Sequence, residues 1–204
     1  MLLKNRIKLL IFITTFCFIQ NVQSKDKIAK EIFAGQESVE FKFDFGNGET
    51  AFGYQKVASS DVYSAEKGFG FVSISPVQSL ERSGNDILTN DLITSSDPFY
   101  FMVDLPEGNY EIKIGLGDPE GESLTTVKAE SRRLMLENVK TKKGEIITKT
   151  ILVNVRSPKI NDTESIRLKS REYPYLNWDN KLSLEFNNTK PCVNFVEIKK
   201  VENV

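Results

Sequence analysis

The sequence predicts an all-β fold, either an antiparallel sandwich or a barrel. Three observations support this prediction. About ten short segments carry apolar residues at every second position or as short apolar runs, which is typical of strands. Gly, Pro, Asn and Asp separate these segments at turn-like positions. No long amphipathic helical pattern occurs, so α/β and TIM-barrel folds are not expected.

The first part of the chain is expected to be a targeting segment rather than part of the fold. Positive residues precede an apolar run over residues 9–18, and Val22-Gln23-Ser24 suits a signal peptidase site. The apolar run is too short to span a bilayer comfortably. We therefore predict a signal peptide over 1–24, a lead-in over 25–37 and one domain over 38–204, in a protein that is secreted or periplasmic.

The clearest strand begins the domain, because apolar and polar residues alternate over residues 39–45 with a period of two. Gly46-Asn47-Gly48 ends this strand. The most polar stretch, 78–96, is predicted to be a long surface loop or lid. Further strands are predicted at 68–75, 98–104, 109–116, 125–129, 133–136, 146–155, 166–168, 182–186 and 193–198.

Composition excludes several classes of function. The chain has 27 Lys and Arg against 28 Asp and Glu, a net charge of -1, which argues against a nucleic-acid partner or a polybasic membrane surface. The absence of His excludes Ser-His-Asp and Cys-His catalysis and His-ligated zinc within this chain. Removal of the signal would leave Cys192 as a single cysteine, which is expected to be a buried, inert thiol.

Two groups of side chains have the chemistry of carbohydrate contacts. Trp178 lies in a Pro-containing segment, where an exposed ring can stack on a sugar face; the alternative is that it plugs the end of the core. Arg132 and Arg133 together suit a carboxylate or uronate. Strand alternation lets only one of them point into a given site, and the alternative is an ion pair with Glu130 or Glu137.

Metal ligation has weaker support in the sequence. Asp44, Asp118 and Asp179 lie at predicted strand ends, so they could hold a structural calcium ion if the fold brings them together. The same acids could supply the carboxylate pair of a glycosidase. No carboxylate cluster has the spacing of an EF-hand loop, and no other cofactor is predicted.

A series of short motifs, in a fixed order, resembles a known family. The motifs are Phe43–Gly46, Gly53–Val57, Tyr63, Gly68–Phe71, Val103–Tyr110, Thr126–Leu134 and Leu176–Asp179. The series covers about residues 38–201 and resembles the galactose-binding-like N-terminal module of rhamnogalacturonan acetylesterases and of related SGNH esterases and agarases. The resemblance implies a galactose-binding-like jelly-roll β-sandwich, similar to carbohydrate-binding modules.

The resemblance departs from the complete enzyme at the catalytic machinery. In the family this module precedes an SGNH hydrolase domain with a Gly-Asp-Ser nucleophile turn and a catalytic His. Here Pro119 follows Gly117-Asp118 in the place of the serine, His is absent, and the chain stops at Val204. Deacetylation is therefore not carried over, and this chain alone is not expected to be an enzyme.

Two hypotheses follow, besides the carboxylate enzyme mentioned above. In the first, the chain is a secreted, non-catalytic module that binds pectic polysaccharide. In the second, it is a structural module or a truncated fragment of an SGNH esterase, which packs on the catalytic domain and binds no sugar. No membrane partner is expected after signal removal. The candidate sugar contacts are Tyr54, Tyr63, Arg132, Arg133 and Trp178.

Overall fold

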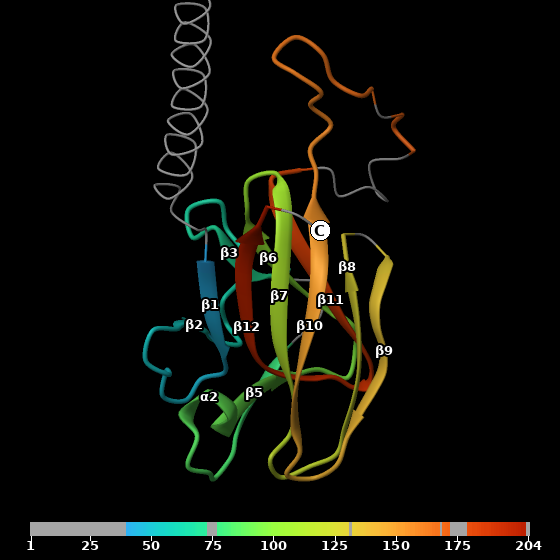
Figure 1. Ribbon diagram of the computed structural model, residues 1–204. Coiled ribbons are helices and arrows are strands. Elements are labelled where there is room, and N and C mark those ends of the chain that lie inside the picture. The colour runs from blue at the N-terminus through green and yellow to red at the C-terminus, as the bar shows by residue number, and fades with distance from the viewer. Residues whose placement is uncertain (1–39, 73–76, 131, 168, 172–178, 203–204) are drawn as a thin grey trace, which may run out of the picture. The chain divides into compact units, whose positions relative to one another are not determined.

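Two β-sheets packed face to face form the domain (Figure 1). The computed structural model describes residues 40–72, 77–130, 132–167, 169–171 and 179–202. The predicted signal peptide, the lead-in and Trp178 lie outside the described residues. No helix in the described part of the chain is long and apolar enough to cross a lipid bilayer. The prediction of an all-β sandwich is confirmed.

Both sheets are almost entirely antiparallel, and the short parallel pair of β1 and β2 is an exception. Sheet A has seven strands; its main path is β10 (Ile146–Val155), β7 (Gly108–Gly117), β12 (Cys192–Val201), β1 (Glu40–Phe45) and β2 (Gln55–Val57), with β5 (Asp91–Thr94) on β12 and β4 (Gln78–Glu81) on β5. Sheet B has five strands in the order β3 (Phe69–Phe71), β6 (Phe99–Asp104), β11 (Lys181–Lys190), β8 (Ser123–Ala129) and β9 (Arg133–Thr141).

The core lies between the sheets and is rich in phenylalanine. The alternation predicted for β1 buries Phe43 and Phe45, whose rings pack edge-on against Phe101 of β6 at centroid distances of 5.2 and 4.8 Å. Phe69 and Phe71 of β3 complete this cluster from the edge of sheet B. Such ring pairs add to the hydrophobic free energy of burial, so the cluster fixes how β1 of sheet A packs on sheet B.

Two sequence predictions are wrong. The stretch 78–96 is not a surface loop, since it contains β4, a single-turn helix α2 (Ile87–Asn90) and β5. All four residues of β5 are buried, and Leu92 and Ile93 are fully covered. The predicted strand at 166–168 is not formed either: Ile166 is exposed outside any strand, and Leu168 lies outside the described residues.

Gly70 allows the chain to cross over the edge strand of sheet B. It has φ +145°, and a Cβ here would lie 2.5 Å from the backbone nitrogen of Tyr63. Residues 61–63 can therefore run directly over β3, where Tyr63 N donates to Phe71 O at 2.9 Å and Phe71 N donates to Asp61 O at 2.7 Å. This close crossing brings the Tyr63 hydroxyl within 2.8 Å of Asp104 Oδ1, at the end of the sandwich where β6 connects to β7, the upper end of Figure 1.

Candidate functional site

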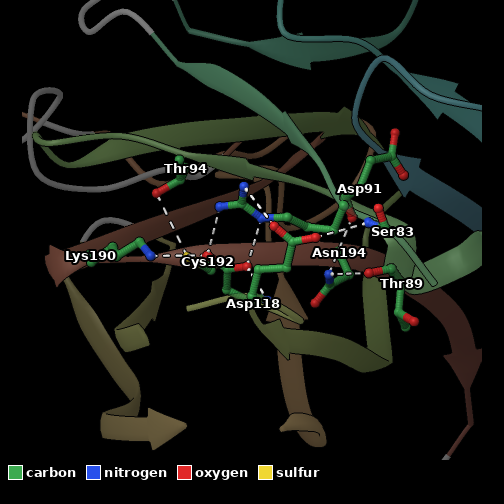
Figure 2. A network of polar contacts seen from close by, with 10 residues as sticks. Ser83, Thr89, Asp91, Thr94, Asp118, Lys190, Cys192 and Asn194 are labelled. Carbon is green, nitrogen blue, oxygen red and sulfur yellow. Dashed lines mark hydrogen bonds and ion pairs between the residues drawn. The ribbon is translucent and has the colours of Figure 1, made fainter. Parts of the chain in front are cut away.

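Asp118 anchors a buried ion-pair network at the lower end of the sandwich in Figure 1, which carries α2 and the 118–122 and 142–145 turns (Figures 1 and 2). Its Oδ1 accepts from Arg82 Nε at 2.9 Å, and its Oδ2 accepts from Arg82 Nη2 at 3.0 Å and from Lys190 Nζ at 2.9 Å. Burial alone would raise the pKa of Asp118, but hydrogen bonds from Arg82, the Glu120 amide and Lys190 outweigh it and lower the pKa to about 2. Asp118 is therefore an ionised link between strands of both sheets.

Two further buried carboxylates, Asp44 and Asp91, lie at the same end, under the loop 46–51. Asp44 Oδ2 accepts from Ala51 N and Asp91 Oδ2 accepts from Gly48 N, both at 2.7 Å. The Oδ1 atom of each has no hydrogen-bond partner within the described residues, although both side chains are almost fully covered. Burial, together with the charge of Asp91, raises the pKa of Asp44 to about 6 against the Ala51 hydrogen bond and the charge of Lys56.

The structure does not bring the three predicted metal ligands together. Asp179 is at the opposite end of the sandwich, where its Oδ1 accepts from Lys181 N at 3.1 Å. Asp118 is already held by Arg82 and Lys190. Within the described ranges, no group of three or more Asp, Glu, Cys or His side chains is placed to hold a metal ion. Calcium binding through Asp44, Asp118 or Asp179 stays a prediction.

Cys192 lies beside this network and is chemically quiet. Its side chain is fully buried, and burial raises the pKa of the thiol. Its Sγ donates to Thr94 Oγ1 at 3.8 Å, a long contact to a neutral partner. A reactive cysteine needs an electropositive, accessible setting that lowers its pKa. The expectation of a buried thiol is confirmed, and its inertness stays a prediction.

The lower end also has a pocket of about 180 Å³. Three carboxylate residues, Glu49, Glu81 and Asp91, contribute to its wall beside Arg82 and Ile87. Among the described residues that line it, none is aromatic, so these residues offer no flat apolar surface on which a sugar ring could stack. The pocket is therefore a weak candidate for carbohydrate binding.

The predicted contacts Tyr54 and Tyr63 lie on different sheets. Tyr54 precedes β2 and lies against the outer face of sheet A, where its hydroxyl donates to Glu197 Oε1 in a short hydrogen bond. Burial and this bond raise the pKa of the Tyr54 hydroxyl. Tyr63 lies beside sheet B at the upper end, where its hydroxyl donates to Asp104 Oδ1 at 2.8 Å. These two tyrosines therefore belong to separate surfaces.

The upper end gathers several polar groups around Tyr63. Lys181 Nζ lies 5.9 Å from the centre of the Tyr63 ring, and burial together with the hydrogen bond to Asp104 raises the pKa of Tyr63 to about 12. Burial raises the pKa of Glu130 to about 7, although the charge of Arg133 opposes this. Asp104 ends β6, Lys181 begins β11, and Glu130 and Arg133 flank the turn between β8 and β9. Strand pairing therefore places these residues at the same end of sheet B.

The paired arginines both lie at this upper end, on the turn between β8 and β9. Arg133 begins β9 opposite Ala129, and Arg132 has φ +86°. Both side chains are exposed. This position is compatible with a carbohydrate contact, because both side chains are exposed. It is equally compatible with an ion pair, because the charge of Arg133 acts on Glu130.

A further set of side chains on the outer face of sheet B was missed by the sequence reasoning. Pairing places Tyr100, Glu185 and Lys128 side by side on three neighbouring strands, with Leu134 next in line on β9. Glu185 Oε1 accepts from Lys128 Nζ and from Asn187 Nδ2, each at 2.9 Å. The sequence reasoning missed this row because Tyr100 lies within the apolar run of β6, between the buried residues Phe99 and Phe101. Strict alternation from Phe99 and Phe101 was the signal that could have found it.

Comparison with known proteins gives the family. The chain matches the family described as beta-agarase/YXIM esterase-like, galactose-binding domain-like, over residues 41–145. It is 33% identical over 96 residues to the uncharacterized esterase YxiM of Bacillus subtilis strain 168, covering 42% of this chain and 25% of that protein. It is 27% identical over 129 residues to beta-agarase A of Zobellia galactanivorans, covering 61% and 23%. The chain thus spans about a quarter of the length of these relatives.

Solved structures agree with this match. The crystal structure of YXIM from Bacillus subtilis superposes with a TM-score of 0.60 at 25% identity, covering 80% of this chain and 40% of that one. The plant receptor-like kinase FER gives a TM-score of 0.51 at 13% identity, covering 81% and 43%, which shows a shared fold alone. The family match covers just over half of the chain, and the fold agrees with it. The chain belongs to the galactose-binding domain-like family of beta-agarases and YXIM-like esterases.

Proposed function

We propose that this chain is a secreted, non-catalytic accessory module that binds polysaccharide, with pectic polysaccharide as the predicted ligand. The family and the similarity to a beta-agarase support an association with polysaccharides. The signal-like N-terminus supports export. Rhamnogalacturonan is the first candidate because of the acetylesterase resemblance, and agarose is the second because of the agarase relative.

The observation that carries this proposal is the row of side chains on the outer face of sheet B. Tyr100, Glu185 and Lys128 are partly exposed, with 29% of the Lys128 side chain and 12% of the Glu185 side chain exposed, and Lys128 Nζ donates to Glu185 Oε1 at 2.9 Å. Burial, with the charge of Glu185, raises the pKa of the Tyr100 hydroxyl, so it stays a neutral donor. An aromatic ring beside fixed hydrogen-bonding groups is the combination that sugar sites use, because the ring covers an apolar sugar face while polar groups orient the hydroxyls.

This face continues to the upper end, where Tyr63 and Arg133 lie. From Asn187 to Lys181 on β11 the surface extends about 20 Å, from the rise of a strand per residue. That length suits a short oligosaccharide chain lying along the strands. In this arrangement the predicted contact Tyr63, beside Asp104 and Lys181, belongs to the same surface as Tyr100, whereas Tyr54 and Arg133, which pairs with the core-facing Ala129, do not.

Affinity electrophoresis of the domain in gels containing rhamnogalacturonan, galactan, agarose or an unrelated glucan tests the proposal. We expect retardation by at least one galactose-containing polymer and none by the glucan. Tyr100→Ala should reduce retardation, whereas Tyr54→Ala should not. The pair is matched, because each tyrosine stands beside a glutamate, on opposite faces of the sandwich.

Each other outcome has a clear meaning. Absence of retardation on every polymer contradicts carbohydrate binding by the domain. Loss of binding in Tyr54→Ala but not in Tyr100→Ala moves the site to sheet A and contradicts the assignment to sheet B. Thermal unfolding of both variants verifies that a change in retardation does not come from loss of the fold.

A second candidate function is a structural module that packs on an SGNH-type esterase domain. The observation that favours it is Phe52, which is 103% exposed at the tip of the turn closed by Tyr54 N donating to Ala51 O at 3.1 Å. A fully exposed aromatic ring is a common interface anchor. Calorimetric titration with a recombinant SGNH domain of the YxiM relative would test it: binding that is lost in Phe52→Ser supports packing, and no heat of binding contradicts it.

A further inference from the structure

A basic segment extends from the upper end of the sandwich, between β10 and β11. It covers residues 156–171, is here named the basic arm, and appears in orange above the end of β10 in Figure 1. Five of its side chains are cationic and two are anionic, which gives a formal charge of +3, whereas the whole chain has -1. The cations are Arg156, Lys159, Arg167, Lys169 and Arg171, and the anions are Asp162 and Glu164.

Backbone hydrogen bonds fold part of the arm into a small hairpin. Ile160 N donates to Glu164 O at 2.9 Å, and Ile166 N donates to Pro158 O at 2.7 Å. The hairpin does not pack into the core, because Ile160 and Ile166 are 63% and 45% exposed. The arm therefore presents its charged side chains to solvent on a folded support.

The base of the arm is attached to the turn that precedes β7. Ser157 Oγ donates to Glu107 Oε2 at 2.7 Å, and Arg156 Nη1 lies 3.5 Å from Glu107 Oε1. Hydrogen bonds from Ser157, together with the charge of Arg156, lower the pKa of Glu107. Glu107 therefore stays ionised at neutral pH and balances the charge of Arg156.

The excess charge of the arm lies on its second half. Lys159 Nζ is paired with Asp162 Oδ1 at 2.8 Å, in the hairpin. The guanidinium groups of Arg167 and Arg171, in contrast, form no ion pair or hydrogen bond with another described residue, and both side chains are exposed. Four residues separate these two arginines, so their Cα atoms are at most about 14 Å apart. Two exposed guanidinium groups are thus available to a ligand within a short distance.

We propose that the basic arm binds carboxylates of an acidic polysaccharide, a polyuronate. This inference rests on the proposed polysaccharide binding and names the charge class of the ligand. A planar guanidinium group forms two parallel hydrogen bonds with a carboxylate, which every uronate residue carries. Arg167 and Arg171 can therefore bind separate uronate residues of the same chain.

A nucleic acid is the other polyanion whose charge the arm would attract, since guanidinium groups also bind phosphates. A nucleic-acid site usually has a broad basic surface and belongs to a basic domain. This chain has a net charge of -1, and its positive excess is confined to one short segment. The polyuronate is therefore the better match, and DNA is the comparison ligand in the test.

The test uses the double variant Arg167→Gln/Arg171→Gln in the full chain. The matched control is Lys142→Gln/Lys143→Gln, which also removes two exposed charges, from the turn at the lower end of the sandwich. Affinity electrophoresis measures binding to polygalacturonate and to neutral galactan, each at low and at high salt. A gel shift measures binding to double-stranded DNA, and thermal unfolding gives the melting temperatures.

We expect the arginine variant to bind polygalacturonate about five-fold more weakly, as the loss of two exposed charge pairs would produce. Its galactan binding and its melting temperature should not change. Asp162→Asn removes an anion from the arm and should strengthen polygalacturonate binding about two-fold. High salt should weaken the binding of polygalacturonate and not that of galactan, because salt screens exposed charges.

The other outcomes separate this inference from the proposed function. Polygalacturonate binding that persists in the arginine variant, or that falls equally in the lysine control, overturns the role of the arm. DNA binding as tight as polygalacturonate binding overturns the polyuronate assignment. A wild-type protein that binds galactan but not polygalacturonate overturns this inference and leaves the proposed function intact. A wild-type protein that binds no polysaccharide overturns the proposed function, and the role of the arm with it.

Discussion

Two aspartates at the lower end of the sandwich are equally buried and have opposite electrostatic surroundings. Asp118 is surrounded by Arg82 and Lys190, which lower its pKa to about 2. Asp44 lies next to Asp91, and its pKa is raised to about 6 mainly by burial. The difference teaches that burial raises the pKa of both carboxyl groups, and that only the hydrogen bonds and cations around Asp118 are strong enough to reverse this shift.

The two aspartates consequently stabilise the fold in opposite pH ranges. A carboxyl with a lowered pKa, such as Asp118, contributes stability above its unfolded pKa of 3.8, and this is lost as the pH falls through about 2. A carboxyl with a raised pKa, such as Asp44, contributes stability below pH 3.8, and this is lost as the pH rises through about 6. These two groups alone therefore favour a stability maximum near pH 4.

Removing the charge of Asp118 should have the largest effect. In Asp118→Asn the hydrogen bonds from Arg82 and Lys190 lose their ionic partner, and we expect a loss of about 3 kcal/mol in the free energy of unfolding at pH 7. Urea denaturation followed by circular dichroism measures it. Asp162→Asn is the matched control. Asp162 also forms an ion pair, with a distance of 2.8 Å between its Oδ1 and Lys159 Nζ, but its side chain is 96% exposed.

The control should change the free energy of unfolding by less than about 0.5 kcal/mol, since exposed ion pairs contribute little. An equal effect of the two substitutions would contradict the role given to burial in this comparison. It would mean that Arg82 and Lys190 recover their hydration when Asp118 loses its charge.

The second effect concerns the other aspartate and has the opposite sign. Because the pKa of Asp44 is about 6 in the fold, the ionised carboxylate costs about 3 kcal/mol of stability at neutral pH relative to pH 4. Asp44→Asn keeps an oxygen that accepts from Ala51 N and carries no charge. We expect the stability of this variant to gain on the wild type as the pH rises from 4 to 7, measured by urea denaturation at each pH.

The pKa of Glu130 is also raised, to about 7, so Glu130 titrates in the same pH range in both proteins. Its contribution cancels in the difference between their free energies of unfolding. A constant difference in free energy from pH 4 to pH 7 would show that Asp44 does not titrate in this range and would remove one side of the comparison.

Local patterns in the sequence predicted most strands because their information is local. The bounds predicted for β10, 146–155, agree with the structure, since Ile151, Val153 and Val155 alternate and are buried. The prediction of a surface loop over 78–96 was wrong for the opposite reason. Its strands are four residues long and surrounded by polar residues, and Leu92 and Ile93 are too short a signal to reveal a strand that other elements cover.

The environment of the aspartates was not predictable from local patterns. Asp44 alternates with core residues on β1 and was expected on the polar face, but the loop 46–51 folds over it. The partners of Asp118, Arg82 and Lys190, are 36 and 72 residues away in the chain. The row formed by Tyr100, Glu185 and Lys128 likewise depends on the register of three strands, which a single strand's sequence does not encode.

The smallest predicted effect concerns Lys56, a cation that acts on both Asp44 and Asp91. The charge of Lys56 lowers the pKa of both Asp44 and Asp91, and its Nζ donates to Asn47 O at 3.1 Å and to Gly48 O. Lys56→Met should destabilise the protein by about 1 kcal/mol at pH 7, where Asp44 is ionised, and by less at pH 4, where Asp44 is protonated. Urea denaturation at the two pH values measures this. An equal loss of stability at both pH values would mean that Lys56 stabilises the fold only through its hydrogen bonds to Asn47 O and Gly48 O. Its charge would then not compensate those of Asp44 and Asp91, and the contrast with Asp118 would be sharper.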